Sequence, residues 1–332
     1  MRSMICFFIL AVIALVGVGC DESFNPKEEF REQYVLQCFV EVSQVGGSPQ
    51  SVMALLARTY DVNGVDPATN TTDPAIAGAE VTLTINQKLY YLLGAQRVSP
   101  DPGRYPTKQW IYTTTVPHIN PDNAISITAK LPNGKTLSAR TTVPSNRNFT
   151  SNYDFSSGLT SPLNLQPGKP NWVIGWDNTG DVEVHLFVPS LTITYTKLVG
   201  QDEISGRVTV PLRYASTPDG IIPIYPSLTT QKQSSFEFAA LDSAMAQISA
   251  GDTNKSMYGV HSAMLNLIEY DLPLSKYFSS INGSLDQYSI RTDESVYSNF
   301  GGGIGILGSY LIHWIEFTFD ERYVHRFGYR YR

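Results

Sequence analysis

The sequence predicts a mostly β protein with two β-rich regions. Short stretches of alternating apolar and polar residues recur along the chain, turn-forming residues separate them, and one or two segments have helical spacing. Many short strands with turn signals between them favour antiparallel sheets. We therefore expect an N-terminal immunoglobulin-like β-sandwich at residues 33–144, a linker at 145–171 and a second β-rich domain with one or two short helices at 172–332.

The N-terminal region shows the strand pattern in several short runs. The segment Pro132-Asn133-Gly134 lies between two of them, and Asn-Gly is a turn signal typical of a β-hairpin. The spacing of apolar residues predicts strands at 34–42, 51–60, 79–85, 125–129 and 136–143.

The second region follows a stretch rich in Ser, Asn, Gly and Pro at 145–171, which we interpret as a linker or a long surface connection. Phe236, Ala240, Ala244 and Ile248 recur every four residues, which predicts a helix over 236–250 that Gly251 ends. A short helix is expected at 273–281. Strands are expected at 172–176, 182–188, 191–195, 208–214 and from 309 to the end of the chain at 332.

The N-terminus has the pattern of an export signal. A basic residue, Arg2, precedes an apolar run over 4–18 that ends at Gly19-Cys20. A transmembrane helix needs roughly 20 apolar residues, so a cleaved signal peptide at 1–19 is the favoured interpretation. The tetrad ending in Cys20 resembles a bacterial lipobox, which predicts a lipidated Cys20 and a tether at 20–32. An ordinary signal peptide with an incidental cysteine is the alternative.

Charge and cysteine content exclude some classes of function. The formal net charge is −6, which does not suit a nucleic-acid partner. The chain has three cysteines, and removal of the signal with lipidation of Cys20 would leave Cys38 alone, so no internal disulfide is expected. Cys38 lies in an apolar strand and is interpreted as a buried, inert thiol.

An oxygen-rich loop follows the second predicted strand. Its Asp and Asn side chains could bind Ca²⁺, which takes six to eight oxygen ligands, although the spacing is not that of an EF-hand. Asx-turns that only shape the loop are the alternative. The candidate residues are Asp61, Asn63, Asp66, Asn70 and Asp73.

A glycine-rich segment near the C-terminus is the second candidate. Residues 303–308 match the spacing G-x-G-x-x-G, but a dinucleotide site needs a following helix within a βαβ unit, so we reject that interpretation. The glycines are expected to permit positive φ angles and close backbone approach. The candidate contact residues are Asn299, Gly301, Gly303, Gly305 and Gly308.

The sequence shows no pattern of an enzyme. The five histidines are not at metal-ligand spacing, and nucleophile-elbow, zinc-protease and P-loop motifs are absent from the sequence. We expect no cofactor and no catalytic residue. Aromatic and basic residues alternate over 322–332, which predicts a half-buried edge strand or an interface anchor.

Several segments together resemble one family. They include Cys20-Asp21-Glu22, Thr59 to Pro67 with Asn70 to Pro74, Gly175-Trp176-Asp177, and Tyr297 to Ser309. Over most of residues 20–310 the chain resembles the domain-of-unknown-function family 4249. That family comprises lipoproteins of Gram-negative bacteria that are often encoded beside TonB-dependent outer-membrane transporters. The glycine-rich segment is the most specific part of the resemblance.

The resemblance implies a cell-surface lipoprotein anchored in the outer membrane through Cys20, with the periplasmic face as the alternative. It also implies a TonB-dependent transporter as partner, and it brings no known catalytic residues. We expect a non-enzymatic accessory or ligand-binding protein. A structural or adhesive surface protein without a small ligand is one alternative, and a hydrolase with a site built from distant residues is another.

The lipid anchor predicts how a Cys20→Ser variant fractionates. Without the thiol no acyl chain can be attached, so we expect the variant in the soluble fraction, whereas the wild-type chain sediments with membranes. Cell fractionation followed by immunoblotting checks this. A Cys38→Ser variant is the control and should stay with the membranes. Unchanged fractionation of Cys20→Ser would refute the anchor.

Overall fold

The computed structural model describes residues 31–44, 48–59, 74–98, 108–152, 171–177, 183–282 and 297–332. The expected signal peptide, Cys20 and most of the tether at 20–32 lie outside these ranges. So do all five candidate residues of the oxygen-rich loop, Asp61, Asn63, Asp66, Asn70 and Asp73. Residues 33–332 form one compact unit. Within the described ranges, no helix is long and apolar enough to cross a bilayer.

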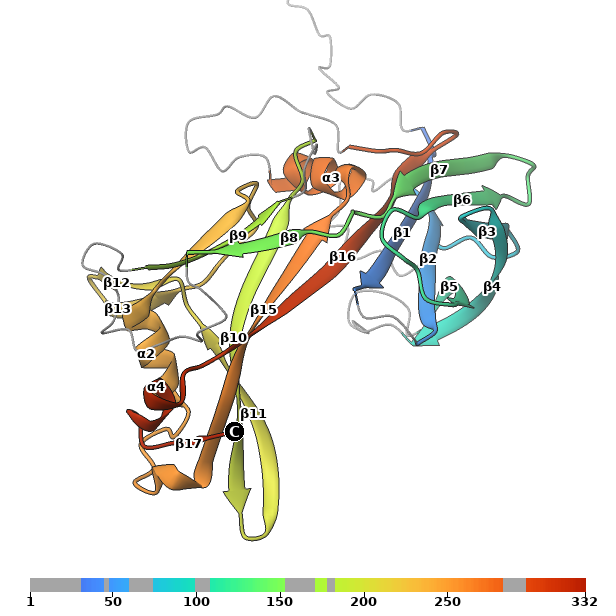
Figure 1. Cartoon of the computed structure of the whole chain (residues 1–332). Coiled ribbons are helices and arrows are strands. Elements are labelled where there is room, and N and C mark those ends of the chain that lie inside the picture. Colours follow the sequence, from blue (N-terminus) through green and yellow to red (C-terminus); the bar gives the residue numbers. More distant parts are fainter. Residues whose placement is uncertain are drawn as a thin grey trace, which may run out of the picture. The chain divides into compact units, whose positions relative to one another are not determined.

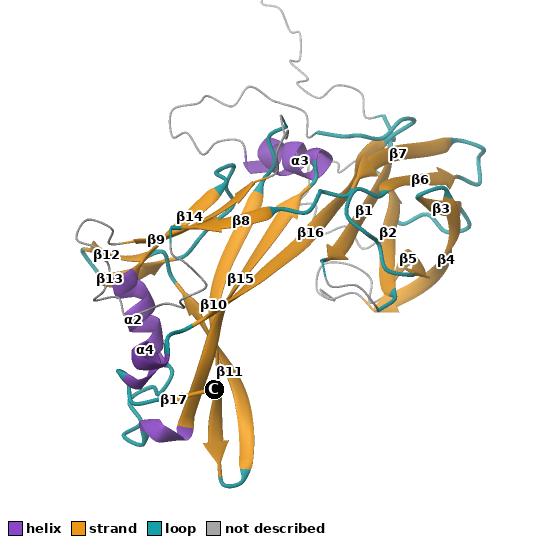
Figure 2. Cartoon of the chain, viewed as in Figure 1, coloured by secondary structure: helices purple, strands orange, loops and turns teal. Residues whose placement is uncertain are grey.

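The prediction of a mostly β chain is confirmed (Figures 1 and 2). The strands are β1 (Tyr34–Ser43), β2 (Gln50–Arg58), β3 (Glu80–Ile85), β4 (Lys88–Val98), β5 (Lys108–Val116), β6 (Ala124–Lys130), β7 (Thr136–Thr142), β8 (Asn148–Ser151), β9 (Asn171–Asp177), β10 (Phe187–Val199), β11 (Asp202–Val210), β12 (Arg213–Thr217), β13 (Gly220–Ile224), β14 (Gln233–Glu237), β15 (Tyr258–Tyr270), β16 (Ile304–Thr318) and β17 (Arg330–Tyr331). The helices are α2 (Phe238–Gln247), a 3₁₀ turn at Lys255–Met257, α3 (Leu272–Asn282) and α4 (Glu321–His325). Both predicted helices are confirmed as α2 and α3, as is the predicted hairpin, β6–β7.

The first hydrophobic core lies between two layers of strands. Strand β4 joins the layers, because Lys88–Leu92 pairs with β3 and Leu93–Val98 pairs with β5. One layer then contains β16, β1, β2 and β5, and the other contains β3, β6 and β7. Alternate side chains of each strand fill the space between them, as in any sheet with one buried face. The immunoglobulin-like topology of this region stays a prediction.

The second core lies between the long strands β10, β15 and β16 and a cover made of β9, β14, α2 and α4. Trp172 of β9 and Phe317 of β16 pack edge to face, with ring centroids 4.9 Å apart. The Trp172 indole N–H donates to Ser151 Oγ over 3.0 Å, so the buried ring keeps its polar atom satisfied.

Strand β16 belongs to both cores (Figure 1). It runs parallel to β1 and antiparallel to β15, so its early residues Leu307 and Leu311 pack in the first core and Phe317 packs in the second. The predicted division near 145–171 therefore separates the two cores but does not divide the sheet. Whether the two regions fold independently stays a prediction.

The linker prediction for 145–171 is wrong at its N-terminal end. Residues Asn148–Ser151 form β8, which pairs with β9. The Asn152 side chain extends this pairing, since its Oδ1 accepts from the Val173 N–H over 2.9 Å and its Nδ2 donates to the Asn171 carbonyl over 2.9 Å. The polar composition of this stretch did not predict a strand. Strand β8 forms through its pairing with β9, which follows residues 153–170 in the chain, and such pairing leaves no pattern in the local sequence.

The prediction of a continuous strand from 309 to 332 is wrong after Thr318. Helix α4 follows, and Asp320 caps it by accepting from the Arg322 N–H over 2.8 Å. Tyr323 is buried and its hydroxyl donates to Asp242 of α2 over 2.9 Å. Tyr323 and Phe327 are four residues apart, so the aromatic alternation that suits a strand also suits one face of a helix.

The glycine-rich segment is explained by close packing, as expected. Gly302 and Gly305 have φ angles of +83° and +135°, where other residues are strained. A Cβ atom on Gly308 would lie 2.2 Å from Leu274 Cγ, so this glycine lets α3 lie on β16. The segment ends in strand β16 and not in a helix, which agrees with the rejection of a dinucleotide site.

This packing predicts that two glycine-to-alanine substitutions differ in their effect on the free energy of unfolding. Gly308→Ala should lower the free energy of unfolding by about 2 kcal/mol or more, because α3 or β16 must shift to admit the methyl group. Gly301→Ala is the matched control, since the nearest atom to its Cβ lies 3.8 Å away, and we expect a change below about 0.5 kcal/mol. Urea unfolding of both variants measures the difference, and equal stabilities would contradict the assigned packing.

Candidate functional site: a polar pocket between the two cores

The inner face of the large sheet changes from apolar to polar between the two cores. Strand pairing places Glu269 of β15 opposite Leu311 and Phe187, and His313 of β16 opposite Leu267. Glu269 and His313 are fully buried. Here the chain also crosses from β7, which covers the first core, to β8, which packs beside the second.

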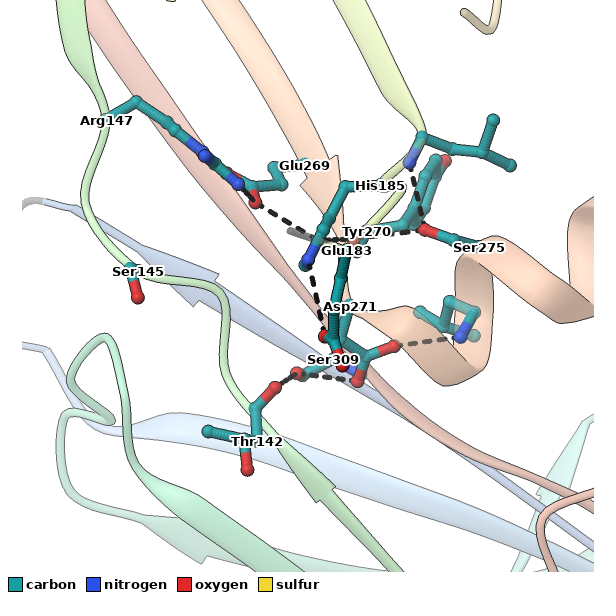
Figure 3. A network of polar contacts seen from close by, with 12 residues as sticks. Thr142, Ser145, Arg147, Glu183, His185, Glu269, Tyr270, Asp271, Ser275 and Ser309 are labelled. Atoms are coloured by element: carbon teal, nitrogen blue, oxygen red, sulfur yellow. Dashed lines mark hydrogen bonds and ion pairs between the residues drawn. The ribbon is translucent and has the colours of Figure 1, made fainter. Parts of the chain in front are cut away.

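Arg147 lies on this crossing segment and forms a buried ion pair with Glu269 (Figure 3). Its Nε donates to Glu269 Oε2 over 2.7 Å, and its Nη2 donates to Oε1. Their side chains are 2% and 0% exposed. Two parallel hydrogen bonds fix both the distance and the orientation of the guanidinium, so the crossing segment is attached to the sheet in one geometry.

Two histidines also contact the carboxylate of Glu269. His313 Nε2 lies 2.9 Å from Oε2, and His185 Nδ1 lies 3.2 Å from Oε1. His185 Nδ1 also lies 2.9 Å from the Tyr270 carbonyl oxygen. Because a carbonyl oxygen only accepts, Nδ1 carries the proton and donates. Each Glu269 oxygen therefore has two partners.

These contacts set the charge of Glu269. Burial alone would raise its pKa, but the hydrogen bonds from Arg147 and His313 outweigh burial and hold the pKa of this carboxyl below its ordinary value. The carboxyl group is therefore ionised at neutral pH. A lowered folded-state pKa stabilises the fold above the unfolded pKa of about 4.3, and this stabilisation is lost as the pH falls through the folded-state value.

Asp271 is a second buried carboxylate and joins three elements. Its Oδ2 accepts from Thr141 Oγ1 of β7 over 2.5 Å and from the Ser309 N–H and Oγ of β16 over 2.5 and 2.9 Å. Its Oδ1 accepts from the Leu274 N–H over 2.9 Å and so caps α3. Burial raises the pKa of Asp271, and the four hydrogen bonds oppose this rise.

A pocket of about 330 Å³ opens beside these two networks. Glu183 and His185 lie on one wall, and Ser145 donates to Asp122 Oδ1 on another. The residues lining the pocket are Asp122, Thr141, Thr142, Val143, Pro144, Ser145, Arg147, Glu183, His185, Leu272 and Pro273. A cavity of this size with a few converging polar groups suits a small polar molecule.

Two features of the described residues concern metal binding and thiol chemistry. Within the described ranges, no group of three or more His, Cys, Asp or Glu side chains is arranged to hold a metal ion. Burial raises the pKa of the Cys38 thiol to about 12, so the thiolate needed for nucleophilic attack does not form at neutral pH. The sequence-based interpretation of Cys38 as a buried thiol is confirmed.

The five candidate residues of the glycine-rich segment are not among the residues that line this pocket. Asn299 uses its side chain internally, since Oδ1 accepts from the Leu307 N–H over 3.0 Å and Nδ2 donates to the Leu307 carbonyl over 2.8 Å. Gly301 exchanges two backbone hydrogen bonds with Ser138. Gly303, Gly305 and Gly308 each have a close neighbour where a side chain would be. A role of these five residues in ligand contact stays a prediction.

Sequence reasoning missed the pocket, whose residues are far apart in the chain. Arg147 and His185 come from two connecting segments, and Glu269 and His313 come from strands β15 and β16. One local signal was present: Glu269 and Asp271 interrupt an otherwise apolar run at the end of β15. Charged residues in a buried strand need partners, so such a pair marks a polar site.

Comparison with known proteins gives no family for this chain. No family model matches the sequence, and no curated protein matches it. Among solved structures, a mutant of Salmonella alpha-2-macroglobulin is similar at 9% sequence identity with a TM-score of 0.20. The match covers 87% of this chain and 15% of that protein. At this TM-score the likeness carries no inference about fold or function.

The buried ion pair predicts that single and double substitutions of Arg147 and Glu269 differ in their effect on the free energy of unfolding. Arg147→Met should lower the free energy of unfolding by about 3–5 kcal/mol, because Glu269 stays buried without its main counter-charge. Arg147→Met combined with Glu269→Leu should cost less, because no buried charge is then left without its counter-charge, and the remaining cost is the hydrogen bond that His313 Nε2 loses. Urea unfolding at pH 7 measures both variants.

Acid titration provides the control for this prediction. The wild-type chain should lose stability below about pH 4.3 as Glu269 takes up a proton, and the double variant should lack this part of the pH dependence. A double variant that is as unstable as Arg147→Met would show that the Glu269 charge is not the cause.

Proposed function

We propose that this protein is a non-enzymatic accessory lipoprotein of the outer membrane that binds a small polar ligand beside a TonB-dependent transporter. The anchor would be the lipid on Cys20, and the protein would face the cell surface. The observation that carries the binding role is the polar pocket between the two cores. The transporter and the location rest on the sequence resemblance over residues 20–310.

The contacts of the pocket favour binding over catalysis. Glu269 and Asp271 are each held by several donors and cap or cross-link parts of the fold. Ser145 donates a hydrogen bond to Asp122 Oδ1 and Thr141 donates one to Asp271 Oδ2, so neither hydroxyl is hydrogen-bonded to a histidine. A nucleophilic hydroxyl needs an adjacent base within hydrogen-bond reach. A hydrolase is therefore the weaker alternative.

The pocket also suits an accessory role through its rigidity. Its walls come from the β7–β8 connection, the segment before β10 and the start of α3. The Arg147–Glu269 pair and the Asp271 network hold the first and third of these walls against the sheet. A preorganised site loses less side-chain entropy when a ligand binds.

A structural or adhesive surface protein is the second candidate function. It is favoured by apolar side chains that face solvent on the β12–β13 hairpin, where Ile221 is 73% and Ile222 is 43% exposed. Such side chains are typical of contact with another macromolecule. This function would not need the pocket.

Co-purification tests the accessory role. We expect a tagged wild-type chain, extracted from its native membrane with mild detergent, to recover a TonB-dependent transporter in comparable amount. Recovery of the chain alone would reject a stable transporter partner and favour the structural alternative. Mass spectrometry of the eluate makes the identification.

A pair of pocket variants tests the ligand role once the transporter is known. Ser145→Trp places a large ring in the pocket, and Asn146→Trp is the matched control because Asn146 is exposed and does not line it. We expect Ser145→Trp to keep the transporter but lower uptake of its substrate severalfold, with Asn146→Trp unchanged. Equal uptake in both variants would reject the pocket as the ligand site.

A further inference from the structure

Strand β11 forms an outer edge of the large sheet (Figure 1). It pairs with β10 from Asp202 to Val210, and within the described ranges no other strand pairs with it. The strand at the opposite end of this sheet, β7, is covered, because Gly301 exchanges two backbone hydrogen bonds with Ser138. Of the two ends of this sheet, β11 is therefore the one where the described residues leave the strand edge open to a partner.

The hairpin between β10 and β11 determines which backbone groups face the open edge. Its turn has two residues, Gly200 and Gln201, so Val199 and Asp202 form the pair that closes it. The pair beside a two-residue turn exchanges both hydrogen bonds, and such pairs then alternate along an antiparallel ladder. The even-numbered residues of β11 therefore bond to β10. The outward-facing N–H and C=O groups are those of Glu203, Ser205, Arg207 and Thr209.

The open edge of β11 lacks the usual features that prevent strand addition. Its sequence contains no proline, and its pairing with β10 shows no register shift, so no bulge bends it. Ile204 is 55% exposed, and Arg207 is exposed and has no ion-pair partner among the described residues. An edge of this kind is a template for a strand of another chain.

The charges along this edge are self-complementary. Glu203 and Arg207 lie two positions before and two positions after Ser205, and all three share one face of β11. When two copies pair antiparallel with Ser205 opposite Ser205, Glu203 of each copy lies opposite Arg207 of the other. Opposite charges in directly paired positions are favourable. A register shifted by two residues loses both pairs, and one shifted by four places like charges opposite each other.

The same register uses the open backbone groups and the exposed apolar side chain. Residues 203, 205 and 207 pair among themselves, so about six backbone hydrogen bonds can form between the two copies. Ile204 would lie opposite Gly206 of the other copy. A Cβ atom on Gly206 would lie 2.3 Å from Tyr195 Cζ, so the Tyr195 ring covers this glycine. Ile204 would thereby gain an aromatic neighbour and lose contact with water.

Glu203 keeps its contacts within its own chain in this arrangement. Arg332 contacts its carboxylate, and Arg330 Nη2 lies 4.0 Å from Oε1. Arg332 passes close to Gly259, where a Cβ atom would lie 3.0 Å from Arg332 Cδ. Gly259 belongs to β15, on the side of β10 away from the open edge. A carboxylate can accept several hydrogen bonds, so Glu203 can also accept from Arg207 of the other copy.

We infer that two copies of this chain pair through their β11 strands, antiparallel and with Ser205 on the two-fold axis. The partner is a second copy because the edge complements itself in charge and in hydrogen-bonding groups, as a two-fold interface requires. The two large sheets then form one continuous sheet. This pairing needs neither the pocket nor the lipid anchor, so it goes beyond the proposed function and does not depend on it.

Disulfide cross-linking tests the register. The parent is residues 20–332 with Cys20→Ser, which contains the whole compact unit and keeps only the buried Cys38. Ser205→Cys places two thiols in directly paired positions, where Cα atoms about 5.5 Å apart suit a disulfide. Thr209→Cys is the matched control on the same face of β11, and in this register its two copies lie about 27 Å apart.

We expect oxidised glutathione to link Ser205→Cys into a dimer at least about tenfold faster than Thr209→Cys, because only the first pair of thiols is held together. A non-reducing gel over time measures both rates. Similar rates in the two variants would overturn the register, and no linked dimer in either would overturn the pairing.

Charge reversal tests the interface without a new thiol. Arg207→Glu turns both pairs between the copies into like-charge pairs, so we expect the dissociation constant of the dimer to rise at least about tenfold. Arg213→Glu makes the same charge change on an exposed residue of β12 and should stay within about twofold of the parent. Sedimentation equilibrium measures the dissociation constants, and circular dichroism should show all three chains folded.

Two results of this experiment would overturn the inference. One is a parent that stays monomeric from micromolar to millimolar concentration, and the other is an equal effect of Arg207→Glu and Arg213→Glu. Cross-linking and sedimentation report on β11 alone, whereas transporter recovery and substrate uptake report on the proposed function. Failure of one can therefore be told from failure of the other.

Discussion

The fold depends on a charge buried between its two cores. Glu269 has no access to solvent, and its ionised form is maintained by the bidentate contact with Arg147 and by His313. A buried carboxylate without such partners would cost several kcal/mol, so the chain around Arg147 must lie where it does. Arg147 sits on the crossing from β7 to β8, and the ion pair therefore sets how the covers of both cores meet the shared sheet.

The Asp271 network and the glycine-rich segment serve the same junction from the other side. Asp271 connects β7, β16 and the start of α3, and Gly308 leaves room for Leu274 of that helix. Both devices act on the part of β16 between Leu307 and Leu311, beside the first core. The pocket lies beside these contacts, which hold its walls in place. We therefore regard it as a preorganised binding site.

The sequence by itself determined the local elements of this protein. Period-two alternation, Asn133-Gly134 and the four-residue spacing from Phe236 to Ile248 were enough to predict the mostly β class, one hairpin and helix α2, because these depend on neighbours in the chain. The tail after Thr318 was mispredicted because aromatic side chains four residues apart suit a helix as well as a strand. Only the tertiary structure decided that β16 is shared by both cores and that Arg147, His185, Glu269 and His313 meet, since these contacts join segments that lie far apart in the chain and leave no local periodicity.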